Sequence, residues 1–297
     1  MFPAMDTHSP VTQTRPQSPA PSADTAPVDA ARTTAVEPRG LSAFLVIAFA
    51  FSWTAWWAGG LLLQGGDPMP AVIAGGFGPM VAAVVVTAAT QGRAGVGALF
   101  RRYSIGRRGA LLPYAIALLA LLAIAGAAAI PIYLGDTALD RDLLRTALMT
   151  VPAQFVLIAL AGGGNEELGW RGFALPRLQG VLSPTAANVM LGAIWAVWHA
   201  PLFAMAGTLQ ADMYFPAYAL LCVGLTVILG NVFNSARGGV LAPVLAHAAI
   251  NVVSGLKAVV AGSPAGAVEV ALVGLVAVAL VVVTRGRLGL PRSGRAG

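Results

Sequence analysis

Two adjacent glutamates, Glu166 and Glu167, stand in an otherwise strongly apolar part of the chain, within Asn-Glu-Glu-Leu-Gly-Trp-Arg at 165–171. A charged side chain at the centre of a membrane-spanning helix costs on the order of 2.5–3.5 kcal/mol on insertion scales, so paired carboxylates in such surroundings indicate a function. A positioned glutamate can act as a general base that takes a proton from water. Other residues must then hold the water and stabilise the charge that develops.

Histidines on two other segments offer those groups. Beyond residue 38 the sequence has only His199 and His247, and both fall inside apolar runs. Trp195 precedes His199 by four residues, and His247 precedes Asn251 by four, so each pair shares one helix face. An imidazole and a carboxamide that project together can stabilise an oxyanion. The alternative for both pairs is a packing role, with hydrogen bonds to neighbouring carbonyls or between helices.

The glutamate segment has its own local pattern. Three glycines, Gly162–Gly164, allow a tight change of backbone direction, and Asn165 is then expected to cap a new helix. Glu167 and Arg171 are four residues apart on that helix and can pair, whereas Glu166 points about 100° away and can face a cavity. We predict that Glu166 is the base and that Glu167 and Arg171 support it. The alternative is an amphipathic surface helix with one ion pair.

A covalent nucleophile is not indicated. The sequence has no Gly-x-Ser-x-Gly turn, and its single cysteine, Cys222, excludes an internal disulfide framework and a multi-cysteine metal site. The residues favour water as the nucleophile.

Composition defines the elements that must position these groups. The 297 residues are 57% hydrophobic and 10% charged, against about 25% charged in soluble domains. We therefore predict an all-α protein, a polytopic transmembrane helix bundle. The net charge of +6 lies mostly in short loops and tails, which sets membrane orientation and does not favour nucleic acid as a partner. Arginine greatly outnumbers lysine, which is compatible with the genome of a GC-rich bacterium. We therefore expect the protein in a bacterial plasma membrane.

About eight apolar runs are long enough to be considered as spans. They are Leu41–Leu63, Pro70–Thr90, Ala110–Leu134, Leu144–Ala161, Pro184–Met205, Phe215–Phe233, Leu241–Leu256 and Ala265–Thr284. The seventh run is short and contains Pro243, which predicts a helix buried in the bundle. Trp53, Trp56 and Trp57 in the first run are interpreted as an interfacial belt or as packing.

Basic residues orient the chain. Arginines gather in the loop expected after the second run, namely Arg93, Arg101, Arg102, Arg107 and Arg108, and in the C-terminal tail. Acidic residues occupy the opposite connections, so both termini are predicted to be cytoplasmic, with the active site within the bundle near that side. Residues 1–38 are rich in Pro, Ser, Thr and Ala and are predicted to be disordered. Residues 39–286 are predicted to form the bundle, and 287–297 a basic tail.

Taken together, the three elements resemble the CPBP intramembrane proteases, the group of the type II CAAX prenyl endopeptidases and bacteriocin-processing relatives. Glu-Glu-x-x-x-Arg matches Glu166, Glu167 and Arg171. An aromatic residue four before a histidine matches Trp195 and His199, and His247 with Asn251 matches the third motif. The resemblance covers about 147–253, the expected protease core.

The resemblance implies an intramembrane endopeptidase in which Glu166 and His199 activate water, while His247 and Asn251 stabilise the oxyanion. Its substrate would be a peptide or protein in or at the lipid bilayer. The resemblance implies either a zinc-dependent mechanism or a mechanism in which glutamate acts without a metal. If zinc is the cofactor, the candidate ligands are Glu166, His199 and His247, and a fourth position would stay open for water. A non-catalytic immunity or scaffold protein and a proton-coupled transporter are the alternative functions.

Overall fold

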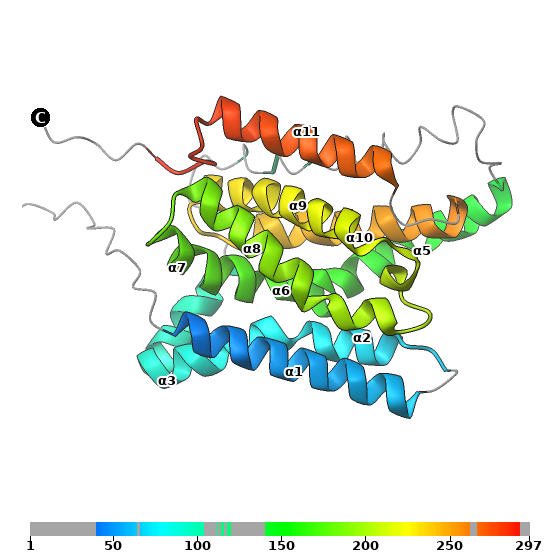
Figure 1. The fold of residues 1–297 in the computed structure, drawn as a ribbon, viewed down its shortest axis with the longest axis horizontal. Helices are drawn as coiled ribbons and strands as arrows, with labels where there is room; N and C mark the ends of the chain where they lie inside the picture. Colours follow the sequence, from blue (N-terminus) through cyan, green and yellow to red (C-terminus); the bar gives the residue numbers. More distant parts are fainter. Residues whose placement is uncertain are drawn as a thin grey trace, which may run out of the picture. The chain divides into compact units, whose positions relative to one another are not determined.

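The computed structural model describes residues 40–63, 66–103, 111, 114–115, 118–119, 140–261 and 266–291, and the regular elements in these ranges are all helical (Figure 1). The predicted all-α class is confirmed. The predicted disordered segment 1–38 and most of the third apolar run, Ala110–Leu134, lie outside the described residues, as does the end of the predicted tail, 292–297.

The helices follow the apolar runs closely. They are α1 (Leu41–Leu62), α2 (Met69–Gly76), α3 (Gly78–Phe100), η1 (Arg101–Tyr103), α5 (Arg141–Ala161), α6 (Gly163–Gly169), η2 (Trp170–Ala174), α7 (Leu175–Gln179), α8 (Pro184–Trp198), η3 (Ala200–Ala204), η4 (Leu209–Asp212), α9 (Phe215–Ser235), α10 (Leu241–Ala261) and α11 (Ala267–Val283).

Within the described ranges, 6 segments are long and apolar enough to cross a membrane, judged by length and composition. They are Leu41–Leu62, Met69–Tyr103, Arg141–Gln179, Pro184–Ala204, Phe215–Ser235 and Leu241–Val260. The last apolar helix, α11, has 17 residues. The chain is thus a polytopic integral membrane protein. The predicted cytoplasmic location of both termini stays a prediction.

Two runs differ from expectation. Helix α3 is interrupted at Gly92 and then runs on to Phe100, so Arg93 lies in a second helical segment rather than in a loop. The chain bends at Gly92, whose φ of 65° is open to glycine because it has no side chain. The seventh run is also longer than predicted, because α10 has 21 residues. Pro243 does not shorten α10, since it lies in the first turn, where its missing N–H removes no helical hydrogen bond.

Helix α6 lies among α3, α5 and α10, while α1 packs on α2 and α3, and α9 packs on α8 and α11 (Figure 1). The ring of Phe44 on α1 stacks on Phe173 at a centroid distance of 5.0 Å and meets Trp170 edge-on at 5.5 Å. A β-carbon on Gly169 would overlap the backbone of Pro79. Small residues at such contacts let membrane helices approach closely.

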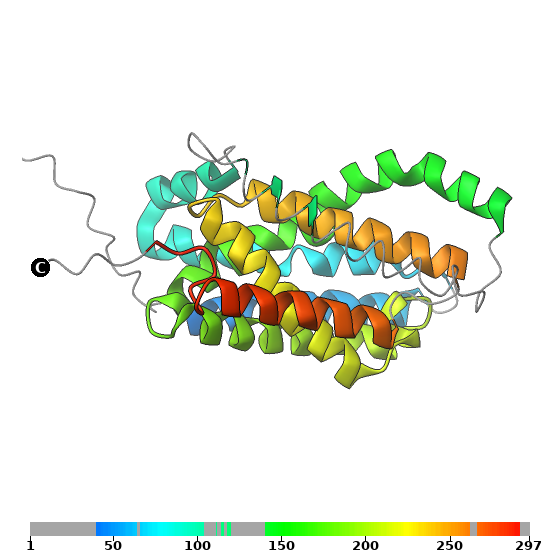
Figure 2. The ribbon, with the colours of Figure 1, turned by 90° about the horizontal axis from the view of Figure 1, so that it is seen from above.

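The margin of the bundle is formed by α5, which lies at its edge in Figure 2 and has no buried residue. By contrast, the segment after α11 is partly packed: Leu288 is fully buried and its carbonyl accepts a hydrogen bond from Asn234 Nδ2 at 2.8 Å. The first residues of the predicted basic tail therefore pack against the bundle.

Candidate active site

The glutamate pair lies on a short buried helix. All seven residues of α6, Gly163–Gly169, are buried, so the alternative of a surface helix is wrong. The prediction that Asn165 caps this helix is also wrong. Gly162 is the N-cap, and Asn165 lies one turn further in, where its Nδ2 donates to Gly76 O at 3.4 Å. The backbone can turn at this earlier point because position 164 is glycine, where a β-carbon would overlap the Ala159 backbone.

A π-helical turn, η2, follows α6 directly. Such turns are rare and occur frequently at functional sites. Its first residue, Trp170, donates from Nε1 to Glu166 Oε2 at 3.3 Å, and Trp195 Nε1 on α8 donates to the same oxygen at 2.9 Å. Two indole N–H groups from different segments therefore fix the Glu166 carboxylate.

The second oxygen of Glu166 is differently placed. Among the described residues Oε1 has no hydrogen-bond partner, and the side chain lines a cavity with only 6% of its surface exposed. Glu166 thus presents one unpaired carboxylate oxygen to a sheltered space, as a general base requires.

Glu167 is fully buried and does not line the cavity. Its Oε1 accepts from Arg171 Nη1 at 2.7 Å, which confirms the predicted pairing, and from His247 Nδ1 at 2.8 Å, which the sequence did not indicate. Arg171 also donates from Nη2 to Thr226 at 3.2 Å, and its guanidinium lies 5.1 Å from the ring centroid of Trp195. Glu167 therefore links α6 to the histidine on α10.

His199 comes directly after the last residue of α8, and its Nδ1 lies 2.9 Å from the carbonyl oxygen of Trp195. A carbonyl only accepts, so Nδ1 carries the proton and Nε2 of the neutral ring is an acceptor. Aromatic rings hold the imidazole, with centroids at 4.6 Å for Trp198, 5.4 Å for Trp195 and 5.5 Å for Tyr218. The packing fixes both the position and the tautomer of His199.

His247 and Asn251 lie one turn apart on α10 and converge beside Gly163. A β-carbon at Gly163 would overlap His247 Nε2 and lie 2.6 Å from Asn251 Nδ2. The two nitrogens therefore approach the same point next to the backbone of α6, which only glycine leaves open. Two nitrogen groups aimed at one point have the arrangement of an oxyanion site.

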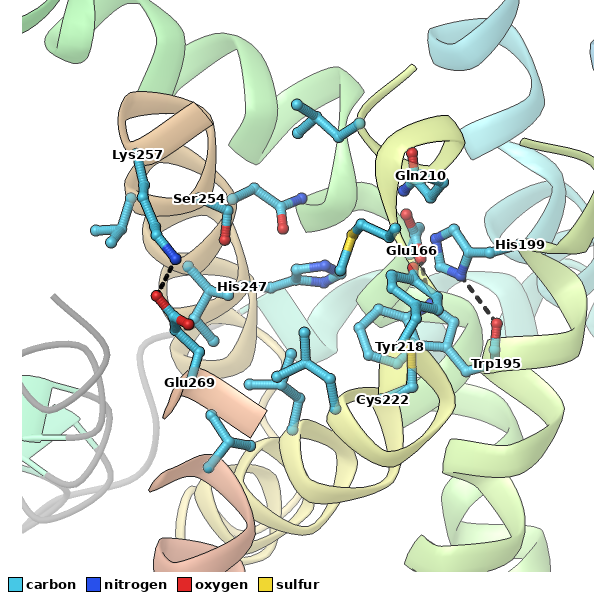
Figure 3. Close-up of a pocket in the computed structure, with 18 residues that line it drawn as sticks. Glu166, Trp195, His199, Gln210, Tyr218, Cys222, His247, Ser254, Lys257 and Glu269 are labelled. Atoms are coloured by element: carbon cyan, nitrogen blue, oxygen red, sulfur yellow. Dashed lines mark hydrogen bonds and ion pairs between the residues drawn. The ribbon is translucent and has the colours of Figure 1, made fainter. Parts of the chain in front are cut away.

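The four predicted catalytic residues line one cavity of about 120 Å³, together with Trp195, Tyr218 and Gln210 (Figure 3). A volume of this size holds several water molecules. The cavity brings together Glu166 from α6, His199 from the end of α8, and His247 with Asn251 from α10. The sequence predicted these members, and the fold places them around a common space.

A metal site is less well supported. No group of three or more His, Cys, Asp or Glu side chains is placed to hold a metal ion in the part of the chain that the structure describes. Glu166, His199 and His247 line the same cavity without forming such a group. The zinc hypothesis therefore stays a prediction, and no step below depends on a metal.

Several residues around the site were not singled out from the sequence. Trp170 stands four residues after Glu166, so the spacing rule that paired Glu167 with Arg171 would also have found it. Trp56, interpreted as belt or packing, is buried and stacks near His199 at a centroid distance of 6.3 Å. Tyr218 and Gln210 carry no sequence signal, because only the folding of α9 and η4 brings them to the cavity.

The fold and the cavity define an α-helical membrane protein with a glutamate and two histidines buried inside the bundle and a half-buried amide, Asn251, lining the same cavity. Residues 148–253, which include all of these groups, match the family model described as type II CAAX prenyl endopeptidase Rce1-like. This region of the chain resembles the CAAX endopeptidase family, as its motifs predicted. The chain is also 38% identical over 64 residues to the CAAX prenyl protease 2 of Methanococcus maripaludis, across 22% of its own length and 23% of that protein. The alignment thus spans less than a quarter of that relative.

Proposed function

We propose that the chain is an intramembrane endopeptidase that hydrolyses a peptide bond of a membrane-associated peptide or protein with water activated by Glu166. One observation supports this above all others: Glu166, His199, His247 and Asn251, from three separate segments, line one cavity inside the bundle. The match to the CAAX endopeptidase family agrees with this function.

Activation of water uses the unpaired groups of the first two residues. A water molecule has two protons, and the cavity offers two acceptors for them, Oε1 of Glu166 and Nε2 of His199. Glu166 takes one proton as the water oxygen attacks the carbonyl carbon of the scissile bond. Trp170 and Trp195 keep the carboxylate in place through its other oxygen. His199 orients the water.

The tetrahedral intermediate places its negative oxygen near Gly163. Asn251 Nδ2 donates to this oxyanion, and His247 donates from Nε2 when that nitrogen carries a proton. Glu167 fixes the other side of the His247 ring through Nδ1. Protonated Glu166 then passes its proton to the leaving nitrogen, the C–N bond breaks, and a carboxylic acid and an amine are released.

The test is cleavage of a peptide library by the purified protein in lipid nanodiscs, with products identified by mass spectrometry. Wild-type protein is expected to cleave a defined set of peptides, whereas Glu166→Gln and His199→Ala are expected to lose cleavage while they insert and unfold like the wild type. Glu166→Gln can also trap bound substrate for identification. Retained cleavage in either folded variant would contradict the mechanism.

The same samples separate the alternatives. A non-catalytic membrane partner would keep its cellular phenotype in the Glu166→Ala variant, and a proton-coupled transporter would show pH-dependent flux in proteoliposomes. Metal content of the wild-type protein, measured by mass spectrometry, tests the zinc prediction, with His199→Ala and His247→Ala as variants of two candidate ligands.

A further inference from the structure

The catalytic cavity has a second charged wall, formed by Lys257 of α10 and Glu269 of α11 (Figure 3). We propose that Lys257 is a specificity-determining residue that binds a carboxylate of the peptide substrate. This proposal rests on the peptidase function above and adds the chemical class of substrate that the cavity prefers.

Lys257 is the only lysine of the chain. It is buried, lies within the candidate span Leu241–Val260, and forms an ion pair with the buried carboxylate of Glu269. Charged residues at such depth are costly and mark functional pathways. A buried ion pair is weak evidence for stability, because apolar residues of similar volume often serve as well or better. Its position in the wall of the catalytic cavity offers a functional reason.

The hydrogen bonds leave Lys257 with spare donors. Glu269 uses both oxygens: Oε1 accepts from Lys257 Nζ, and Oε2 accepts from the backbone N–H of Gly266 at 2.7 Å, at the start of α11. Glu269 is the sole partner of Lys257 among the described residues, and an ammonium group has three N–H donors. Two donors therefore have no partner in the described part of the chain and can bind a second carboxylate.

The charge balance at this wall also favours an anion. The positive end of the α11 dipole offsets part of the Glu269 charge, in addition to the Gly266 hydrogen bond. Among the described residues that line the cavity, Lys257 is the sole Lys or Arg. A substrate carboxylate that enters the cavity has this one cation as its partner.

The spacing along α10 sets a distance between this group and the scissile bond. His247, Asn251, Ser254 and Lys257 all line the cavity. At a rise of 1.5 Å per residue, Lys257 lies about 9 Å along the helix axis from Asn251 and about 15 Å from His247. An extended peptide covers about 3.3 Å per residue. The carboxylate is therefore expected about three to five residues from the cut, as a chain terminus or as an acidic side chain.

The experiment compares three versions of one peptide from the set that wild-type protein cleaves. The first has a free C-terminal carboxylate, the second a C-terminal amide, and the third an amide with glutamate at the corresponding position. For wild type, we expect the KM of the recognised carboxylate peptide to be about tenfold lower than the KM of the neutral amide peptide. The reason is the charge-assisted hydrogen bond that only the carboxylate can form with Lys257. Lys257→Gln is expected to remove this difference by raising KM, with kcat retained.

Controls separate recognition from folding. Lys257→Arg should keep the preference, and the double variant with Lys257→Gln and Glu269→Gln should keep a neutral hydrogen-bonded pair but lose the preference. Arg145→Gln removes one exposed positive charge from α5, away from the cavity, and should change nothing. Equal KM values for all three peptides in wild type, or a preference that survives in the double variant, would overturn the proposal.

Binding of the same peptides to Glu166→Gln protein requires no turnover. The binding measurement can also use a peptide series chosen without regard to cleavage. Carboxylate-selective binding of such a series that depends on Lys257, without cleavage of any peptide by wild type, would contradict the peptidase function alone. Cleavage without such selectivity would contradict the role of Lys257 alone.

Discussion

Two neighbouring glutamates on α6, Glu166 and Glu167, have different surroundings. Glu167 is fully buried, and one of its oxygens accepts from both Arg171 and His247. Glu166, its neighbour, is held by two indoles through one oxygen and presents the other to the cavity. Oε2 of Glu167 also has no hydrogen-bond partner among the described residues, but Glu167 does not line the cavity. The comparison teaches that access to the cavity decides which of the two carboxylates can react. Substitutions of the two glutamates should therefore fail in different ways.

Glu166→Gln should have the largest effect on activity. We expect cleavage to fall about 10²–10⁴-fold, because the general base is lost, while the unfolding midpoint stays at the wild-type value. The amide oxygen of glutamine can still accept from Trp170 and Trp195, so the packing survives. Cleavage assays and thermal unfolding in detergent measure the two properties. Substantial cleavage by this variant would mean that the cavity face of α6 holds no base.

Glu167→Gln is the matched change on the packed face. We expect a loss of about 3–5 kcal/mol in the free energy of unfolding, because the buried guanidinium of Arg171 loses its counter-charge. Unfolding in detergent mixtures measures this loss. The double variant with Glu167→Gln and Arg171→Met removes both charges and should recover part of the stability. Wild-type stability in the single variant would show that the pair is not needed for folding.

Gly163→Ala tests the convergence of His247 and Asn251. Its methyl group would occupy the point that both nitrogens approach, so cleavage should fall about 10²-fold, as when an oxyanion donor is lost. Gly274→Ala on α11 is the control, because a β-carbon there meets nothing within 4 Å. Equal activity of the two variants would show that the oxyanion does not bind beside Gly163.

The indole contacts to Glu166 should give the smallest effects. Trp195→Phe removes the 2.9 Å hydrogen bond and keeps an aromatic ring beside His199, so we expect cleavage to fall about tenfold. Trp170→Phe removes the longer bond of 3.3 Å and should cost about threefold. Rates for both variants, compared with their unfolding midpoints, check the order. The reverse order would mean that Trp170 is the main support of the carboxylate.

The local features of the site were largely readable from the sequence. Spacing of four residues paired Glu167 with Arg171 and placed His247 beside Asn251, because side chains one helical turn apart share a face. Apolar runs gave the helices, since backbone groups in a membrane must be paired within a helix. Where local rules competed, the prediction was wrong: Asn165 is a good capping residue, yet the glycines before it begin the helix.

The sequence by itself predicted the helical membrane class, the resemblance to the CAAX endopeptidases, and the members of the candidate site: the glutamate, histidines and amide that its motifs name. Only the tertiary structure decided which groups meet. The contact of Glu167 with His247 joins residues 80 positions apart, and the bond from Trp195 to Glu166 joins residues 29 apart. Periodicity reports which side chains share one helix face, whereas these contacts depend on how different helices pack. For the same physical reason the sequence did not indicate Lys257 and Glu269, because they come to line the candidate cavity only once α10 and α11 are folded together.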